Sequence, residues 1–434
     1  MNNSSNNLII ISLDALRADD IELMKKLPNF SILIQNGAYA KRVKTIYPSL
    51  TYPAHTTIVT GNYPKNHGIV NNKLMIPENK KVPWFWYRKY IKTKTIYDLA
   101  KESGLTTAAI FWPVSAKSSI KYNMPEIFSY NKYVSQEISS LLSGSLLYQL
   151  KLFKKYKHMK KGINEPELDD FAIQCTLDTL KYYHPNLLLL HLLDLDTQRH
   201  NYGTHSSEAL DALKRHDERL GKILMLLNKY NLDNNYNIVV LGDHGFQDFD
   251  KYININGIFK NENLLSVDIN NNIVSWEAFA KSCDGSSYIY LKDSSNKLLK
   301  NHINSILEKL ITNPKNGIKA IYNNSELVSL GGDPNATFML EANEGFVFSE
   351  KIDENLITPA KSTKENSVGT HGYSPENSNL DTLFIGYGPS FKSNTSINNM
   401  NLIDIAPTLA KSLEIEFPNC DGSIIYELLK KNKA

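Results

Sequence analysis

Short, continuously apolar segments constrain most strongly what this 434-residue chain can fold into. They span residues 8–13, 107–111, 187–193, 237–241 and 382–385. A strand that is apolar on both faces needs cover on both faces, as in a parallel sheet that lies between two layers of helices. We therefore expect these segments to form the buried strands of one such sheet.

Segments with helical periodicity lie between these strands, and the alternation predicts the fold class. They span residues 20–37, 95–103, 167–183, 206–230 and 403–413. Alternating strands and helices predict an α/β fold, here a three-layer αβα sandwich with a largely parallel central sheet. We expect one domain over residues 1–434.

Two stretches interrupt the alternation, and we interpret them as insertions that form a cap over one edge of the sheet. The first is 73–165, which is rich in aromatic residues and lysine. The second is 250–365, which holds a strand-like 287–291, a helical 296–311 and turns rich in glycine and asparagine. The Asn- and Ser-rich segment 392–401 is expected to be a surface loop.

Composition and charge argue against several classes of protein. The formal net charge is +3 and the basic residues are scattered, so we expect no binding of nucleic-acid polymers. Cys175, Cys283 and Cys420 are far apart, which argues against a disulfide framework. No signal peptide and no stretch of ~20 apolar residues that could cross a bilayer is visible, which predicts a cytoplasmic protein without a membrane span. The abundance of Asn, Lys and Ile is typical of AT-rich bacterial genomes.

Three segments place histidines and carboxylates at spacings that suit metal ions. They contain Asp196 with His200, Asp243 with His244 between two glycines, and His371 in a glycine-flanked loop. Asp14, which follows the first strand, adds a third aspartate. Nitrogen and oxygen donors of this kind suit zinc, and six are more than the four ligands of one tetrahedral ion. They predict two zinc ions that share a substrate.

Each of these groups alone has a simpler structural explanation. An Asp-His pair in a turn is usually hydrogen-bonded rather than metal-bound, and Asp14 could cap a following helix. Their joint occurrence argues for metal binding, because Asp14, Asp194, Asp196 and Asp243 all follow predicted strands and should meet at one sheet edge. We interpret the other histidines as structural: His55, His67, His158, His184, His191, His205, His216 and His302.

A fourth segment of interest runs from Tyr47 through Thr51 and precedes a helix-compatible stretch. Thr51 alone would be interpreted as a helix cap, although a helix N-terminus also favours an anion. Beside two metal ions the same hydroxyl suits a nucleophile, because a bound zinc ion lowers its pKa. The Gly- and Asn-rich turn that ends at Asn72 can aim a side-chain amide at phosphate.

Taken in order, these blocks resemble the nucleotide pyrophosphatase/phosphodiesterase family of the alkaline phosphatase superfamily. The blocks are Asp14, TYPAHTTIVTG beginning at Thr51, NYPKNHGIVNN ending at Asn72, DTQRHNYG, GDHG and THGY, and they extend from residue 8 to residue 373. The resemblance implies an alkaline-phosphatase-like fold and a small phosphodiester or nucleotide as substrate.

The resemblance also implies a role for each matching residue. Asp196, His200 and His371 would hold one zinc ion, and Asp14, Asp243 and His244 would hold the other. Thr51 would bridge toward both ions, attack phosphorus and form a phosphothreonine that water then hydrolyses. Asn72 would donate to a non-bridging phosphate oxygen, and Tyr52 would stack on a nucleobase.

The sequence does not determine which substrate is cleaved. Ala54 replaces an asparagine of the family's TFPNH motif, and the insertions match no family segment. A phosphomonoesterase, in which Lys117 could meet the extra phosphate charge, and a phosphonoacetate-type hydrolase would use the same metal ligands. A non-catalytic binding protein is a weaker alternative, because the six ligands and the nucleophile are all retained.

Overall fold

An eight-stranded sheet forms the centre of the computed structural model, which describes residues 7–79, 81–129, 134–360 and 367–431. Its strands, in spatial order, are β18 (Thr395–Asn401), β2 (Ala38–Lys44), β17 (Thr382–Tyr387), β6 (Tyr236–Leu241), β1 (Asn7–Leu13), β5 (Leu187–Leu192), β3 (Thr107–Ile110) and β4 (Tyr122–Met124). β17 runs opposite to the other seven, so the predicted, largely parallel sheet is confirmed.

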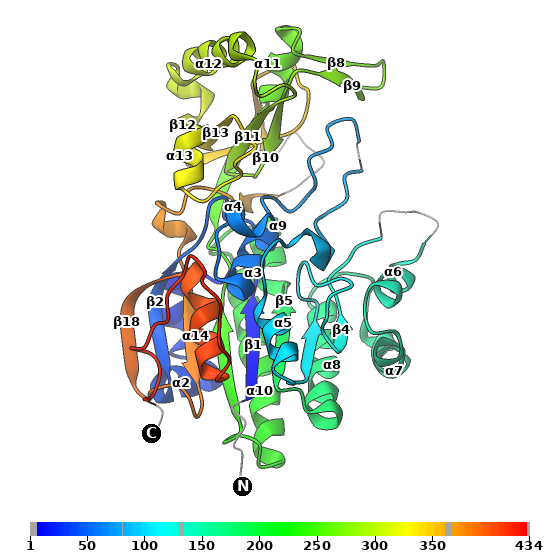
Figure 1. The fold of residues 1–434 in the computed structure, drawn as a ribbon, viewed down its shortest axis with the longest axis vertical. Coiled ribbons are helices and arrows are strands. Elements are labelled where there is room, and N and C mark those ends of the chain that lie inside the picture. Colours follow the sequence, from blue (N-terminus) through cyan, green and yellow to red (C-terminus); the bar gives the residue numbers. More distant parts are fainter. Residues whose placement is uncertain (1–6, 80, 130–133, 361–366, 432–434) are drawn as a thin grey trace.

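Helices cover both faces of this sheet and complete the predicted αβα sandwich (Figure 1). One layer contains α2 (Pro28–Asn36), α7 (Leu146–Tyr156), α8 (Glu167–Tyr183) and α10 (Ser207–Lys229). The opposite layer contains α3 (Thr51–Thr60), α5 (Ile96–Glu102) and α14 (Ile405–Ser412).

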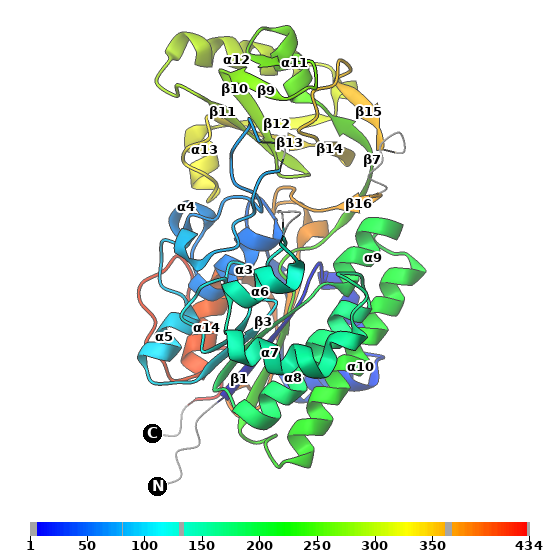
Figure 2. The ribbon, with the colours of Figure 1, turned by 90° about the vertical axis from the view of Figure 1, so that its right-hand side faces the viewer.

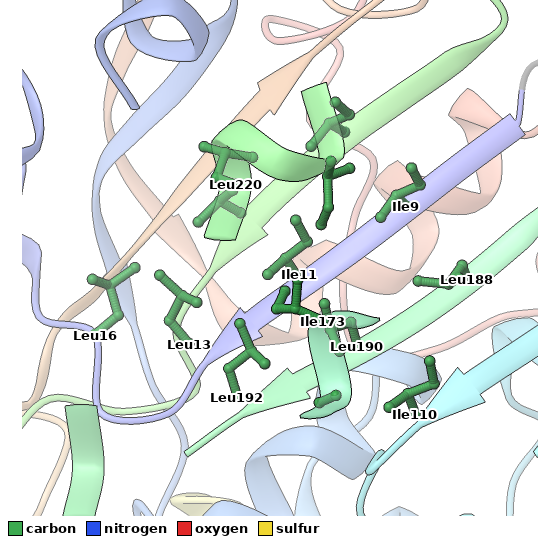
Figure 3. Packing of buried hydrophobic residues seen from close by; sticks show 14 of the residues in the cluster. Ile9, Ile11, Leu13, Leu16, Ile110, Ile173, Leu188, Leu190, Leu192 and Leu220 are labelled. Carbon is green, nitrogen blue, oxygen red and sulfur yellow. The ribbon is translucent and has the colours of Figure 1, made fainter. Parts of the chain in front are cut away.

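The two layers bury alternate side chains of the same strands. Ile9 and Ile11 of β1 pack toward α8 and α10, as Figure 3 shows, whereas Leu8 and Ile10 pack toward α3 and α14. Every residue from position 8 to position 13 is buried. The period of two along a strand explains why a strand in a three-layer fold must be apolar throughout.

Two predicted elements differ from the structure. The helix expected over 20–37 is divided into α1 (Ile21–Met24) and α2. Pro28, which lacks an amide proton, cannot continue a helix but suits the first position of the next one. The loop expected over 392–401 is largely β18, because its backbone pairs with β2 at the sheet edge, where polar side chains remain in solvent.

Residues 247–360 build most of a second lobe above the carboxyl ends of the central strands (Figures 1 and 2). One four-stranded sheet contains β10 (Ala278–Ser282), β11 (Ser286–Leu291), β13 (Phe338–Ala342) and β12 (Ile318–Asn323). Another contains β7 (Gln247–Ile253), β14 (Gly345–Phe348), β15 (Ile357–Pro359) and β16 (Gly369–Thr370), and a hairpin contains β8 (Leu265–Val267) and β9 (Ile273–Trp276). The helices α11 (Ile255–Asn261), α12 (Lys297–Ile311) and α13 (Asn324–Ser329) accompany these strands.

The range 73–165 is divided between the central sheet and its surroundings. Its strands β3 and β4 pair in the central sheet, so only other parts of this range can act as an insertion. One of these parts reaches the second lobe, where the Trp276 indole N–H donates to the Glu78 carboxylate at 2.9 Å. Within the described residues, every helix is too short or too polar to span a bilayer. The cytoplasmic location stays a prediction.

A buried carboxylate joins the second lobe to the segment before α3. The Tyr47 hydroxyl donates to Glu341 of β13 at 2.7 Å, and the backbone N–H of Ser374 donates to the other carboxylate oxygen at 2.9 Å. Burial raises the pKa of Glu341 to about 7, despite these two hydrogen bonds. The ionised carboxylate is therefore less favourable in the folded protein than in the unfolded chain.

This difference predicts a pH dependence of stability. The folded protein retains the Glu341 proton up to about pH 7, whereas the unfolded chain loses it near its ordinary value of 4.5, so the free energy of unfolding falls as pH rises between them. The decrease amounts to at most about 3 kcal/mol. In Glu341→Gln, thermal melts at pH 5 and pH 7.5 should differ less than in the wild type. Glu344→Gln, on the exposed turn beside β13, is the matched control and should melt like the wild type at both pH values.

Candidate active site

The carboxyl ends of three neighbouring parallel strands place the predicted metal ligands at one sheet edge. Asp14 follows β1, and Asp243 and His244 follow β6. α9 (Asp194–Tyr202), which Figure 1 labels, begins just after β5. Asp196 and His200 lie one turn apart on the same face of this helix. His371 follows β16, which pairs with β7 at the base of the second lobe. All six predicted ligands therefore meet beneath this lobe.

These six side chains form two groups of three. Asp196, His200 and His371 make one group, and Asp14, Asp243 and His244 make the other. Within each group, one possible ligand atom per residue lies within 4.8 Å of the others. The rings of His244 and His371 stack with centroids 3.8 Å apart, so the two groups adjoin each other. This division is the one that the resemblance implied.

Backbone carbonyl groups orient the three histidine rings. Nδ1 of His200 lies 2.8 Å from the carbonyl oxygen of Gly369, and Nδ1 of His371 lies 2.9 Å from that of Ser49. Nδ1 of His244 lies 3.1 Å from the carbonyl oxygen of Gly245. A carbonyl oxygen only accepts, so each Nδ1 donates its proton, and Nε2 keeps a lone pair in each ring that is neutral. Metal-binding histidines are held in the same way. Although burial opposes it, the charge of Asp196 raises the pKa of His200 to about 9.

The crowding of carboxylates favours positive charge at the site. Burial, together with the charges of Asp243 and Asp196, raises the pKa of Asp14 well above its usual range. Burial likewise raises the pKa of Asp243 to about 6. One oxygen of each of the three aspartates is buried without a hydrogen-bond partner among the described residues. Burial lowers the pKa of both His244 and His371 to about 4, which keeps their Nε2 atoms free to bind a metal at neutral pH. These donors fit divalent metal ions.

A second layer of residues, which the sequence did not identify, supports Asp14. Nε2 of His191 lies 3.1 Å from Asp14 Oδ2, and its Nδ1 lies 2.9 Å from Glu126. The Tyr52 hydroxyl donates to the other oxygen of Glu126 at 3.0 Å. His191 was interpreted as structural, but a histidine in the otherwise aliphatic β5 was a signal that a polar partner lay nearby.

Thr51 and Asn72 lie together beside the two groups of ligands. Thr51 is the first residue of α3, and its Oγ1 lies 3.4 Å from Nε2 of His244. The backbone N–H of Tyr52, in the first turn of the helix, donates to Asn72 Oδ1 at 2.9 Å. This contact turns the Asn72 amide so that its N–H groups can donate elsewhere. Both Thr51 and Asn72 line the cavity described next.

A cavity of about 960 Å³ extends from the ligands to the second lobe. Its lining includes the aromatic residues Trp84, Phe128, Phe249, Tyr252 and Phe279. Tyr52, which was expected to stack on a nucleobase, is fully buried and does not belong to this lining. It packs edge-to-face against Trp84 with ring centroids 5.1 Å apart, and its hydroxyl group is bound to Glu126. The stacking role predicted for Tyr52 is therefore wrong in this geometry, because Trp84 lies at the cavity wall instead.

Asp194, the remaining acid that follows a strand, belongs to a different cluster. It groups with Asp169 and Glu165, and the three carboxylates could in principle hold a cation. Arg219 lies 2.8 Å from Asp194 and 3.3 Å from Asp169, and Arg215 lies 2.7 Å from Asp194. Guanidinium groups already provide the positive charge here, so the cluster is structural.

Comparisons with known proteins identify the family of this chain. The family model for type I phosphodiesterase / nucleotide pyrophosphatase matches residues 8–374. The chain is 25% identical over 417 residues to human ectonucleotide pyrophosphatase/phosphodiesterase family member 1, covering 92% of this chain and 39% of that protein. It is 26% identical over 434 residues to the venom phosphodiesterase of Naja atra, covering 94% of this chain and 44% of that protein. It thus spans less than half the length of these curated relatives.

A solved structure extends the comparison to the fold. Human ectonucleotide pyrophosphatase/phosphodiesterase 5 matches with a TM-score of 0.70 at 21% identity, covering 98% of this chain and 100% of that chain. The murine protein, in an inactive threonine-to-alanine variant in complex with AMP, matches with a TM-score of 0.69 at 20% identity over the same shares. The chain belongs to the type I phosphodiesterase / nucleotide pyrophosphatase family.

Proposed function

We propose that this chain is a zinc-dependent hydrolase that cleaves phosphodiester or pyrophosphate bonds through a covalent phosphothreonine at Thr51. The observation that carries the proposal is the Thr51 hydroxyl, which lies at the start of a helix and beside two adjoining groups of carboxylate and imidazole ligands. A hydroxyl is a weak nucleophile unless its surroundings favour its deprotonated form.

Two zinc ions would complete this site. Asp196, His200 and His371 would hold one, and the group of Asp14, Asp243 and His244 would hold the other. When bound, the ions would supply the positive charge that favours deprotonated Thr51 and that stabilises the charge developing on the phosphate oxygens. Imidazole nitrogen and carboxylate oxygen are ligands that suit zinc.

The reaction would proceed in two successive displacements at phosphorus, and Thr51 and Asn72 would take part in both. The Thr51 oxygen forms a bond to phosphorus while the bond from phosphorus to the leaving oxygen breaks. Water then attacks the same phosphorus, and the bond to Thr51 breaks, which restores the hydroxyl. Asn72 would donate its amide N–H to a phosphate oxygen in both steps, since its carbonyl oxygen is occupied by the Tyr52 N–H.

Nucleotides are the substrates that the cavity suits best. A murine relative of known structure is described in complex with AMP, and the aromatic cavity wall here offers flat apolar surfaces beside Thr51. We further propose that the second lobe within 250–365 acts as the cap, because Tyr252, Phe279 and Phe348 line the cavity from that side.

The main alternative, a phosphomonoesterase, receives no support from Lys117. This lysine was the candidate to meet the additional charge of a monoester, but it is exposed and is not part of the cavity lining. Its ammonium group lies over the Tyr87 ring, 5.9 Å from the centroid. Lys73, which does line the cavity, lies over Trp84 at 5.8 Å.

Replacing Thr51 tests the nucleophile. Thr51→Ala should lower kcat by at least about 10³-fold, because water alone would have to attack phosphorus, while zinc content stays near that of the wild type. Turnover of a chromogenic diester and zinc analysis of the purified protein give both values. Thr60→Ala, which alters a buried threonine in the last turn of the same helix, should retain wild-type turnover. Full activity in Thr51→Ala would refute the assignment.

Substrate charge tests the reaction class. Because Lys117 lies outside the cavity lining and Lys73 lies over the Trp84 ring, kcat/KM should be higher for bis-p-nitrophenyl phosphate than for p-nitrophenyl phosphate. The two compounds share a leaving group, so their ratio reports how the site discriminates between a diester and a monoester. A clear preference for the monoester would favour the phosphomonoesterase instead.

Removing the support of Asp14 tests the metal site. His191→Ala should weaken zinc binding at the Asp14 group by about 10–100-fold, because Asp14 loses the donor that orients it. In a chelator titration, one of the two zinc ions should then be released at a lower chelator concentration than in the wild type. His67→Ala removes another fully buried histidine, whose Nε2 contacts Thr57 at 3.1 Å, and should leave the titration unchanged. Equal loss in both variants would contradict this role of His191.

A further inference from the structure

Five large aliphatic side chains are exposed on α6 (Gln136–Ser143) and α7, two helices that contact each other. Their exposed fractions are 49% for Ile138, 69% for Leu142, 49% for Leu146, 74% for Leu147 and 44% for Leu150. We name this set the aliphatic patch. Scattered exposed leucines are ordinary, but a contiguous apolar patch on a folded domain usually marks an interaction surface.

The opposite side of α7 fixes the helix to the central domain. Tyr148, Leu152 and Phe153 are buried in the core that also contains Phe171 of α8. The Tyr148 hydroxyl lies 2.7 Å from Thr179 Oγ1, and the rings of Phe153 and Phe171 stack with centroids 5.8 Å apart. The aliphatic patch is therefore the outward side of a firmly anchored pair of helices, which Figure 2 shows on the surface of the central domain.

Lysines follow the aliphatic patch along the chain. Residues 135–161 contain six lysines and a single acidic residue, Glu137. Two of these lysines have carboxylate partners, since Lys155 pairs with Asp178 at 2.7 Å and Lys161 pairs with Glu167. The other four are Lys151, Lys154, Lys157 and Lys160, and none has an ion pair with a carboxylate in the described part of the chain. Lys151, Lys154 and Lys157 are exposed.

We propose that the aliphatic patch and the adjoining lysines dock this protein on an anionic lipid surface. Aliphatic side chains that enter the boundary between headgroups and acyl chains, together with lysines that contact anionic headgroups, are the two components of peripheral membrane binding. α7 presents them in sequence along its exposed side, with Leu146, Leu147 and Leu150 before the lysines.

A second copy of the chain fits this surface less well. In a two-fold symmetric dimer the same patch faces itself, so the lysines would meet a surface whose residues 135–161 offer a single acidic residue, Glu137. Burying leucines beside uncompensated like charges is unfavourable. An anionic bilayer, in contrast, satisfies both the apolar and the basic residues at once.

The docking surface and the candidate active site are separate. None of the aliphatic patch or its lysines lines the cavity, and none is among the six metal ligands. Altering the surface should therefore leave hydrolysis of a soluble substrate unchanged, so this proposal and the proposed function fail independently.

Vesicle binding tests the proposal with the full chain. The wild type should sediment with vesicles that contain 30% phosphatidylserine in phosphatidylcholine, and less with phosphatidylcholine alone. A double variant, Leu142→Asp with Leu147→Asp, should weaken the partition coefficient by at least about tenfold. A triple variant of Lys151, Lys154 and Lys157 to Ala should weaken it by about 10²-fold at physiological salt.

Matched controls separate docking from non-specific hydrophobicity. Leu298→Asp removes an equally exposed leucine, 83% accessible at the start of α12 on the second lobe, and should leave vesicle binding unchanged. All variants should keep the wild-type melting temperature and turnover of a soluble diester. The proposal is overturned if the wild type does not bind the anionic vesicles, or if Leu298→Asp weakens binding as much as the α6–α7 variants. It is also overturned if the patch variants convert a dimer to a monomer in analytical ultracentrifugation.

Discussion

Parallel pairing of β1 with both β5 and β6 is the constraint on which the candidate site depends. Ile11 aligns with Leu190 on one side and with Val240 on the other, so all three strands end at nearly the same height. Each is followed within a few residues by an aspartate that faces the same space. A slip in either pairing would move Asp196 or Asp243 by about 3.3 Å per residue, which is comparable with the separation of the ligand atoms. The extensive apolar cores on both faces of the sheet hold this register.

The site that this register creates opposes folding. Asp14, Asp243, His244 and His371 are buried beside the half-buried Asp196 and His200. The pKa of Asp14 is raised because its ionised form is desolvated and repelled by neighbouring carboxylates. Backbone carbonyl groups and His191 hold the ligands in place, but they leave one oxygen of each aspartate without a partner in the described structure. The cores stabilise the fold, whereas repulsion between the carboxylates at the sheet edge destabilises it. Bound cations would reduce this repulsion.

The second lobe is connected to the same edge through a few residues. The Ser49 carbonyl oxygen accepts from His371, and the Ser49 hydroxyl donates to the Tyr373 carbonyl oxygen at 2.9 Å. Tyr47, two residues earlier, binds Glu341 of the second lobe. The segment that leads into α3 and Thr51 is therefore held by the loop that carries His371 and by the lobe above it. Any movement of the lobe would therefore displace Thr51 and His371 together.

The sequence by itself determined the central architecture and indicated the candidate ligands, because both depend on local patterns. Apolar segments such as 8–13 specify strands buried on two faces, and an aspartate directly after such a strand must lie at the sheet edge. It also indicated Thr51 and Asn72, although only through the order of several motifs. Local patterns were insufficient at two places. Pro28 begins a helix, although a proline can also end one. The polar segment of β18 forms an edge strand because its backbone pairs with that of β2.

Tertiary structure alone decided what surrounds the ligands. Tyr52 is buried rather than exposed to substrate, because Trp84, 32 positions later, packs against it. His191 and Glu126 support Asp14, but these residues are far apart in the chain and share no spacing that could reveal their contact. The aliphatic patch likewise depends on tertiary structure, because the packing of Tyr148, Leu152 and Phe153 in the core determines which side of α7 faces outward. Contacts between distant segments depend on how the layers pack, and no local pattern encodes that packing.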